Sequence, residues 1–156
     1  MDIFGKCTGF TAAKEAMDAG LYPYFIPLSG NEGTEAEFQG RRLIMCGSNN
    51  YLGLTTHPEV RQAAIDAIEE FGTSCTGSRF LNGTLEMHEQ LERALADWVG
   101  KESALVFSTG MQVNLGVISA VVCKDDIVIL DKDDHASIVD GAFLSRGKIK
   151  RFRHND

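Results

Sequence analysis

The sequence predicts an α/β fold, in which helices alternate with the strands of a mainly parallel sheet. Three short apolar runs, residues 104–107, 127–130 and 149–152, have the length and the apolar content of strands. Two helical patterns separate them, at about residues 111–121 and 136–145, and this alternation builds parallel β-α-β units. Because the runs are too apolar for a half-exposed sheet, we expect helices to cover both of its faces.

Two longer amphipathic helices are expected before these units. The first begins at Pro58, which suits a first helical turn because its missing N–H costs nothing there, and it ends at Gly72. The second carries an apolar face from Leu85 to Val99 and stops at Gly100. The glycine-rich stretch between the two helices, residues 72–83, has no periodicity and is predicted to be a loop.

The N-terminal region has a different texture. A short helical pattern runs from about residue 10 to residue 20, with Thr11 as its cap and Gly20 as its stop. Residues 21–28 are aromatic and contain two prolines, so they are expected to be extended. Residues 34–38 and 42–46 flank a Gln39–Gly40 pair, a pattern that predicts a small hairpin.

Composition and charge restrict the function. The chain has 156 residues, enough for one domain with its own core, and a formal net charge of -7, which argues against a nucleic-acid partner. No apolar stretch approaches the ~20 residues that a membrane span needs, and the first residues lack a signal-peptide pattern. Four scattered cysteines, without a C-x-x-C pair or clustered histidines, predict no metal site and a reducing, cytoplasmic location (Cys7, Cys46, Cys75 and Cys123).

Chemistry is expected where the parallel strands end, because ligands of open α/β sheets bind at that edge. After the first predicted strand, Gly110 would let the backbone approach a ligand, and the N–H groups of the new helix suit an anion such as phosphate. After the second, His135 opens a helix, where an imidazole can stack on a flat ring and donate a hydrogen bond. A tight turn at Gly110 and a solvent-facing histidine at a helix start are the plain alternatives.

The remaining histidines carry weaker signals. His88 falls on the apolar face of its helix, a position typical of a satisfied core histidine. His57 and His154 lie in a loop or at a strand end, with nothing nearby in sequence to recruit them. The acidic residues before His135 are expected to be a solvated cap that favours the helix N-terminus.

Four segments together resemble the α-oxoamine synthase family of fold-type I pyridoxal-phosphate enzymes. They are S-N-N-Y-L-G-L at residues 48–54, G-S-R-F-L-N-G-T at 77–84, S-T-G-M-Q-V-N at 108–114 and D-H-A-S at 134–137. Turn chemistry explains the glycines and asparagines of the first two segments singly, but four motifs in the family's order and spacing are specific. Within the family the chain is most similar to bacterial serine palmitoyltransferases.

The resemblance implies a role for five residues. Gly110 and Met111 match the pair whose backbone contacts the cofactor, although many relatives have an aromatic residue where Met111 stands. His135 matches the histidine that stacks on the pyridine ring, acts in catalysis and helps to hold the substrate carboxylate. Asn49 matches an asparagine near that carboxylate. Ser78 lies in a glycine-rich loop that, in relatives, approaches the active site of the neighbouring subunit of a homodimer, so it is expected to bind substrate there.

The resemblance also implies a reaction, in which an amino acid, L-serine by this similarity, condenses with an acyl-CoA, palmitoyl-CoA, and loses carbon dioxide to give a 3-ketosphinganine-type product. Three other readings stay open: an 8-amino-7-oxononanoate synthase, a 2-amino-3-ketobutyrate CoA ligase, or a non-catalytic partner that keeps only the cofactor cradle. Residues 1–47 are then an N-terminal region, and residues 48–156 are the first, incomplete part of the large cofactor-binding domain.

Three groups that this chemistry needs are not matched in the chain. They are a lysine that forms the Schiff base, a carboxylate for the pyridinium nitrogen and an arginine for the substrate carboxylate. Seven lysines are present, but none stands in the family's Schiff-base context (Lys6, Lys14, Lys101, Lys124, Lys132, Lys148 and Lys150). We therefore expect the chain to be a truncated piece of a longer enzyme and to be inactive alone.

Overall fold

The computed structural model describes residues 2–156, apart from the side chains of residues 31 and 32. The chain divides into two compact units, the first ending at Ser74 and the second spanning Cys75–Asp156. The domain boundary expected between residues 47 and 48 stays a prediction. No helix among residues 2–156 combines the length and the apolar character that crossing a membrane requires.

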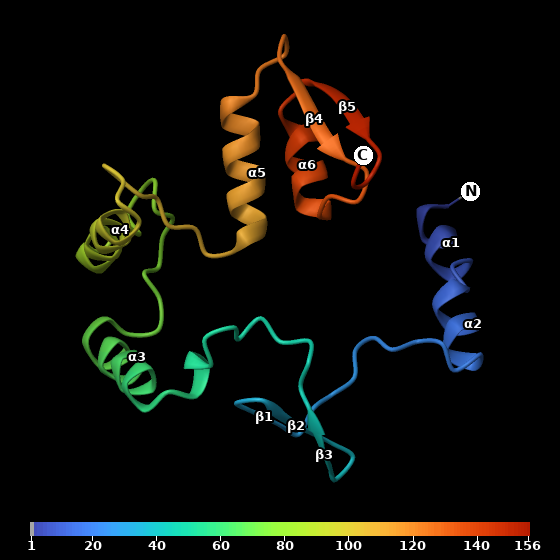
Figure 1. Ribbon diagram of the computed structural model, residues 1–156, viewed down its shortest axis with the longest axis horizontal. Coiled ribbons are helices and arrows are strands. Elements are labelled where there is room, and N and C mark those ends of the chain that lie inside the picture. The colour runs from blue at the N-terminus through green and yellow to red at the C-terminus, as the bar shows by residue number, and fades with distance from the viewer. Residues whose placement is uncertain (1) are drawn as a thin grey trace. The chain divides into compact units, whose positions relative to one another are not determined.

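The first unit opens with two short helices, α1 (Ile3–Thr8) and α2 (Ala12–Asp18) (Figure 1). The sequence did not predict α1, although its cap was readable: the Asp2 carboxylate accepts a hydrogen bond from the Phe4 N–H at 3.3 Å. The helix expected at residues 10–20 is confirmed as α2. Thr11 is its N-cap residue, and Gly20 follows it with a φ of +69°.

A small antiparallel sheet follows, in the order β1 (Gly30–Glu32), β2 (Glu35–Phe38) and β3 (Arg41–Ile44). The predicted hairpin is confirmed, with Phe38 opposite Arg41 in the register. Gln39 and Gly40 form its turn with φ values of +50° and +71°, because a two-residue connection that matches strand twist needs positive φ at both positions. The short strand β1 was not predicted.

The rest of the first unit is helical. A single 3-10 turn, η1 (Leu54–Thr56), follows Gly53, whose φ is +67°. Helix α3 (Pro58–Phe71) then begins at its N1 proline and ends at Gly72, as the sequence predicts.

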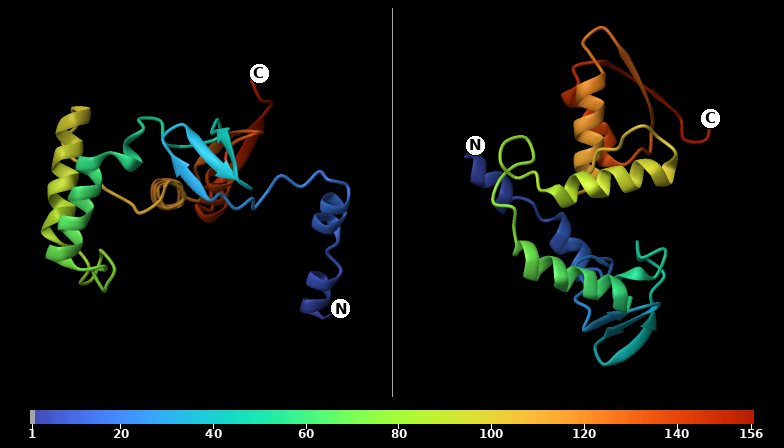
Figure 2. Two further views of the ribbon diagram at one scale, coloured as in Figure 1. Left: turned by 90° about the horizontal axis from the view of Figure 1, so that it is seen from below. Right: turned by 90° about the vertical axis from the view of Figure 1, so that its left-hand side faces the viewer.

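The second unit contains the β-α-β arrangement. Its elements are α4 (Glu86–Val99), α5 (Gly110–Val121), β4 (Ile127–Asp131), α6 (Ala136–Leu144) and β5 (Lys148–Phe152). Strands β4 and β5 pair in parallel, from Ile127 opposite Lys148 to Asp131 opposite Phe152, with α6 as the connection between them. The predicted parallel unit is therefore confirmed, and Figures 1 and 2 show α5 and α6 side by side.

Two details of the predicted sheet are wrong for the described residues. Residues 104–107 are not a strand: no described strand pairs with them, and the Val106 N–H instead donates to the Glu92 carboxylate of α4 at 2.9 Å. The helices were also expected to cover both faces of the sheet, and one face of β4 is left exposed. Leu130 is buried on one face of β4, but Ile127 and Ile129 on the other face are 59% and 70% exposed. A strand forms only where another strand pairs with it, and an apolar face is buried only where another element packs on it. A local sequence pattern contains neither piece of information.

Close packing of α5 against α6 is the main tertiary contact of the second unit. Ala142 is fully buried, and a Cβ on Gly141 would lie 2.7 Å from the Asn114 carbonyl oxygen and 3.2 Å from Ile118. Only glycine allows the helices to approach so closely at this point. The approach places the start of α6 beside the first turns of α5, where the predicted ligand residues lie.

Candidate functional site

The N-terminus of α5 has free backbone donors. Thr109 is the N-cap residue, and its Oγ1 accepts a hydrogen bond from the Gln112 N–H at 3.2 Å. The first N–H groups of a helix have no partner inside it, so those of Gly110 and Met111 stay available to an acceptor. A Cβ on Gly110 would meet no described atom within 4 Å, and Met111 is 54% exposed. The backbone therefore presents an open site for an anion here.

His135 is the N-cap residue of α6, and its ring is held on one side. Its Nδ1 accepts a hydrogen bond from the Ser137 N–H at 3.2 Å and lies 2.8 Å from the Ser137 Oγ. The same hydroxyl accepts a hydrogen bond from Asn114 Nδ2 of α5 at 2.8 Å. The structure thus brings together two of the predicted segments, residues 108–114 and 134–137, and the link passes through Asn114 and Ser137, to which the sequence assigned no role.

The loop of residues 77–84 closes on itself. The Ser78 carbonyl oxygen accepts hydrogen bonds from the N–H groups of Leu81, at 3.1 Å, and Gly83, at 2.8 Å. A Cβ on Gly83 would collide with the Gly77 carbonyl group, and one on Gly77 would collide with the Asn82 side chain. Neither glycine has a positive φ. The reason for these glycines is therefore close approach within the loop, and the predicted turn conformation does not account for them.

Arg79 fixes this loop to α4. Its guanidinium donates to both carboxylate oxygens of Glu92 at 3.1 Å, and the same carboxylate accepts the Val106 N–H. The Glu92 side chain is only 15% exposed. Hydrogen bonding to Arg79, and then to the Val106 N–H, holds the pKa of Glu92 below its ordinary value. One carboxylate thus joins the loop, α4 and the extended segment that leads to α5.

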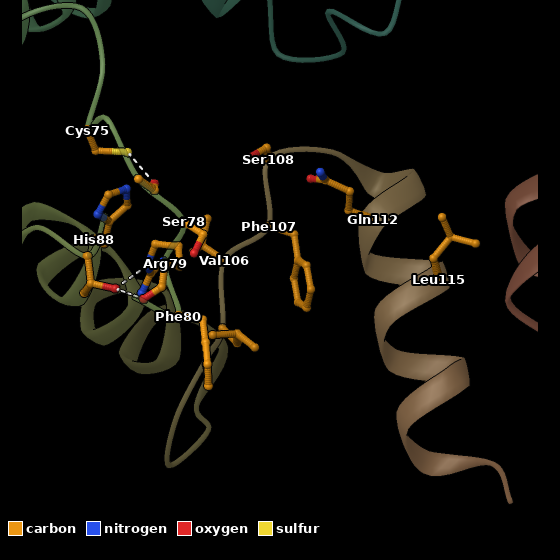
Figure 3. A pocket seen from close by; sticks show the side chains of 13 residues that line it. Cys75, Ser78, Arg79, Phe80, His88, Val106, Phe107, Ser108, Gln112 and Leu115 are labelled. Carbon is orange, nitrogen blue, oxygen red and sulfur yellow. Dashed lines mark hydrogen bonds between the residues drawn. The ribbon is translucent and has the colours of Figure 1, made fainter. Parts of the chain in front are cut away.

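A hollow of about 820 Å³ lies between this loop, the extended segment and α5. Ser78, Arg79, Phe107 and Gln112 line it, and Figure 3 shows Phe107 between the extended segment and α5. His88 also lines it. As predicted, His88 is satisfied, since its Nδ1 accepts the Leu85 N–H at 2.9 Å, but it is half-buried at the start of α4 and does not lie in a core.

Asn49 belongs to the first unit. Its side chain is exposed, and its Oδ1 accepts a weak hydrogen bond from the Tyr51 hydroxyl at 3.5 Å. The surrounding residues, 48–52 and 54–56, line a shallow hollow of about 690 Å³. The roles expected for Asn49 and for the exposed Ser78 stay predictions.

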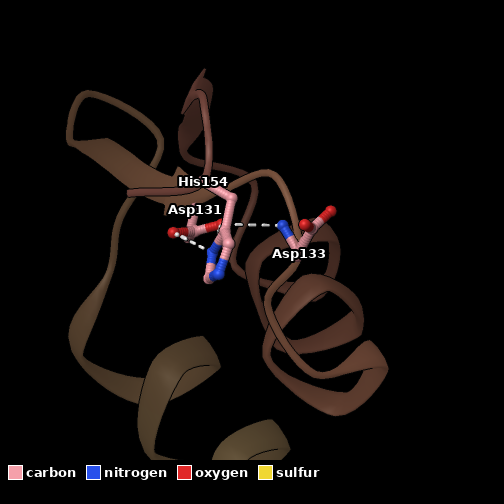
Figure 4. A group of neighbouring side chains, drawn as sticks. All are labelled: Asp131, Asp133 and His154. Atoms are coloured by element: carbon pink, nitrogen blue, oxygen red, sulfur yellow. Dashed lines mark hydrogen bonds and ion pairs between the residues drawn. The ribbon is translucent and has the colours of Figure 1, made fainter. Parts of the chain in front are cut away.

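Asp131 is the centre of a further cluster at the end of β4 (Figure 4). It accepts the Asp133 N–H at 2.8 Å, and its carboxylate lies 3.1 Å from His154 Nδ1. The Asp133 N–H, and then His154, lower the pKa of Asp131. His154 therefore has a partner that its sequence neighbourhood did not reveal, because β5 folds back beside β4. The three side chains lie near enough to share an ion. Asp131 pairs with His154 and accepts the Asp133 backbone N–H, and the expectation of no metal site stays a prediction.

Known proteins resemble this chain in sequence and in fold. Residues 41–156 match the family model for aminotransferase class I and II. A serine palmitoyltransferase from Sphingobacterium spiritivorum is 49% identical over 97% of this chain, and an 8-amino-7-oxononanoate synthase from Geobacter sulfurreducens is 43% identical over 92%. The solved serine palmitoyltransferase from S. paucimobilis, with a bound PLP–myriocin aldimine, matches the whole chain at 42% identity with a TM-score of 0.91.

The match covers only part of each relative. The chain spans 38% of the Sphingobacterium enzyme, 37% of the Geobacter enzyme and 40% of the solved chain. The family model, in contrast, covers most of the present chain, from the second hairpin strand onward. The predicted resemblance to serine palmitoyltransferases is confirmed. The chain belongs to the aminotransferase class I and II family.

Proposed function

We propose that this chain provides the cofactor cradle of a pyridoxal-phosphate-dependent acyltransferase of the α-oxoamine synthase type. The observation that carries the proposal is the Asn114–Ser137 hydrogen bond, which keeps His135 beside the helix whose N-terminus has free backbone donors. The cofactor is a flat aromatic ring with a phosphate. An exposed imidazole and an open helix N-terminus in one compact unit suit those two parts.

The residues of the second unit fit that cofactor. The N–H groups of Gly110 and Met111 would hold the phosphate, and the open space beside Gly110 leaves room for it. The ring of His135 would stack on the pyridine ring, since its Nδ1 is engaged with Ser137 and the residue is exposed. When bound, pyridoxal phosphate supplies an electron sink for carbanion chemistry at the amino-acid α-carbon.

The chain's own groups would bind and orient the substrates. His135 Nε2–H would donate a hydrogen bond to the amino-acid carboxylate and hold the labile bond perpendicular to the cofactor ring, an orienting effect that can be large. Asn49 would donate to the same carboxylate. Ser78 would act at the active site of the neighbouring subunit of a homodimer, from a loop whose shape Gly83 and Arg79 maintain.

The preferred substrates are L-serine and palmitoyl-CoA, condensed with loss of carbon dioxide. The 49% identity to a serine palmitoyltransferase supports this choice. An 8-amino-7-oxononanoate synthase is the second candidate, because the Geobacter enzyme of that name is 43% identical over nearly as much of the chain. The location proposed for either activity is the cytoplasm.

Paired assays separate the two candidates. The polypeptide encoded by the whole reading frame that contains this chain is assayed with serine and palmitoyl-CoA, and in parallel with alanine and pimeloyl-CoA. The proposal expects release of coenzyme A and carbon dioxide with the first pair only. Turnover of the second pair alone would replace the substrate assignment and keep the family chemistry, and turnover of neither would refute the proposed function.

A further inference from the structure

A continuous hydrogen-bond path runs from α5 to His135. Asn114 Nδ2 donates to the Ser137 Oγ at 2.8 Å, and that oxygen lies 2.8 Å from His135 Nδ1. The Ser137 backbone N–H donates to the same ring nitrogen at 3.2 Å. Ser137 is 2% exposed, Asn114 is half-buried and His135 is exposed. The path therefore begins inside the helix pair and ends at the surface where a ligand can reach the ring.

The chemistry of the donors fixes the direction of every bond in this path. A backbone N–H only donates, so His135 Nδ1 must accept and carries no proton itself. The amide nitrogen of Asn114 also only donates, so the Ser137 oxygen accepts there and turns its own proton toward Nδ1. Three donations thus point the same way. In the neutral ring the single proton is then on Nε2.

We propose that Asn114 and Ser137 are positioning residues that hold His135 as the Nε2–H tautomer and fix the plane of its ring. The ring then presents one hydrogen-bond donor outward, which suits an anionic acceptor such as a carboxylate. That use of the donor rests on the proposed function, but the tautomer does not, because the groups that set it all belong to the chain.

The packing of α5 against α6 holds the first residue of this hydrogen-bond path, Asn114, in place. Gly141 of α6 packs against the backbone of Asn114, so the two helices are in contact at the residue that starts the path. Asn114 also lies four residues, about one turn, after Gly110 on the same helix. Helix α5 therefore combines two tasks: its N-terminus offers the backbone donors, and its second turn orients the imidazole beside them.

The direct test is the tautomer of His135, read from the ¹⁵N NMR signals of its two ring nitrogens in the full chain without cofactor. Spectra are recorded near pH ~8.5, about two units above the ordinary imidazole pKa of ~6.5. The chain has four histidines, and a His135→Gln variant assigns the signal. We expect Nδ1 at the downfield position of an unprotonated nitrogen and Nε2 at the upfield position of a protonated one.

Two variants should move the Nδ1 signal downfield, because each removes the Ser137 hydroxyl as a donor to Nδ1. In Asn114→Asp the Ser137 hydroxyl donates to the new carboxylate and no longer to Nδ1, which keeps the Ser137 backbone N–H as its donor, so Nδ1 shifts downfield. In Ser137→Ala the hydroxyl donor is lost, so Nδ1 shifts downfield as well. Gln112→Glu is the matched control, since it adds the same charge to α5 at a position that does not face Asn114. It should leave the signal in place.

Three results would overturn the proposal: wild-type His135 with its proton on Nδ1, averaged signals for the two nitrogens, or equal shifts in Asn114→Asp and Gln112→Glu. Dispersed amide spectra verify that each variant keeps its fold. If Asn114→Asp fails to fold, Ser137→Ala still tests the hydrogen-bond path. A separate titration with pyridoxal phosphate distinguishes the two claims. Failure to bind the cofactor with the shifts intact would refute the function alone, whereas binding without the shifts would refute the path alone.

Discussion

Arg79 and Glu92 form a two-bond ion pair, in which Arg79 Nη1 and Nη2 each lie 3.1 Å from a different carboxylate oxygen. Glu92 accepts the Val106 N–H with the same group. The pair crosses from a loop of the S-R-F-L-N-G motif to a helix and, through Val106, to the segment that enters α5. Paired arginine and carboxylate groups are geometrically specific, so this contact sets where the loop lies within the second unit.

Replacing the carboxylate should release the loop. In Glu92→Gln the acceptor is neutral and only one oxygen remains, so the two-bond pair with Arg79 is lost and the hydrogen bond from the Val106 N–H is weakened. The amides of Val106 and Gly83 should then exchange hydrogen faster. Hydrogen-exchange mass spectrometry measures this. Glu89→Gln on the same helix is the control, because its pair with Arg93 is exposed and longer, at 3.5 Å. Equal exchange in the two variants would contradict the role assigned to Glu92.

The same pair predicts a pH dependence. Arg79 and the Val106 N–H lower the pKa of Glu92 below its ordinary value of 4.5, so the folded state favours the charged form. The stability that Glu92 contributes is then fully present above pH 4.5 and is lost as the pH falls through the lowered pKa. Denaturant unfolding of wild type and Glu92→Gln should therefore differ at neutral pH and converge in acid. A difference that grows in acid would have the wrong sign.

Gly83→Ala should destabilise the second unit. The added methyl group would collide with the Gly77 carbonyl, which is backbone and cannot rotate away, so we expect a loss of about 1–3 kcal/mol in the free energy of unfolding. Gly47→Ala is the control. It meets no described atom within 4 Å and has no positive φ, so its cost should stay within about 0.5 kcal/mol. Urea unfolding measures the free energy of unfolding of both variants. An equal loss in Gly83→Ala and Gly47→Ala would contradict the claim that Gly83 is needed for its close approach to the Gly77 carbonyl.

Local patterns predicted most helices of this fold, and the missing features are non-local. Pro58, Gly72 and Gly100 mark helix ends through their own backbone preferences, so one sequence window contains the information. The pairing of residues 104–107 depends on a neighbouring strand, and no local window contains it. The contact between His154 and Asp131 likewise depends on the return of β5 beside β4.

The candidate site likewise contains residues that the sequence could predict and residues that it could not. Gly110 and His135 were readable because each follows an apolar run, and ligands of open α/β sheets bind where parallel strands end. Of the two runs, only the one before His135 forms a described strand, β4. The roles of Asn114 and Ser137 were not readable, since they arise from a contact between two helices, and the two residues are 23 positions apart in the chain. A polar side chain inside the apolar helix 110–121 was the one available signal, and its partner could not be named without the packing at Gly141.

Asp131 should titrate below its ordinary pKa of 3.8, with the Asp133 N–H as the larger cause and His154 as the smaller. Asp133→Asn keeps that N–H, so the carboxyl of Asp131 should still titrate low. His154→Gln should raise its pKa part of the way toward 3.8. Carboxyl ¹³C NMR titrations measure both variants. A full return to the ordinary value in His154→Gln would show that the backbone hydrogen bond is not the main cause.

The lysines of the chain should not form a specific Schiff base. Incubation of the 156-residue chain with pyridoxal phosphate, followed by borohydride reduction and peptide mapping, is expected to give absent or diffuse labelling over the seven lysines. This follows because none of them lies in the family's Schiff-base motif. Stoichiometric labelling of a single lysine would contradict the expectation and would identify the reactive amine.

The central claim is that His135 and the start of α5 hold pyridoxal phosphate. Equilibrium dialysis of the cofactor against wild type, His135→Ala and the control His154→Gln tests it most directly, because it requires neither turnover nor a lysine adduct. Loss of ring stacking is worth about 0.5–1.5 kcal/mol, so the account predicts that His135→Ala binds roughly 2- to 12-fold more weakly while His154→Gln binds like wild type. Equal affinity in wild type and His135→Ala would contradict it.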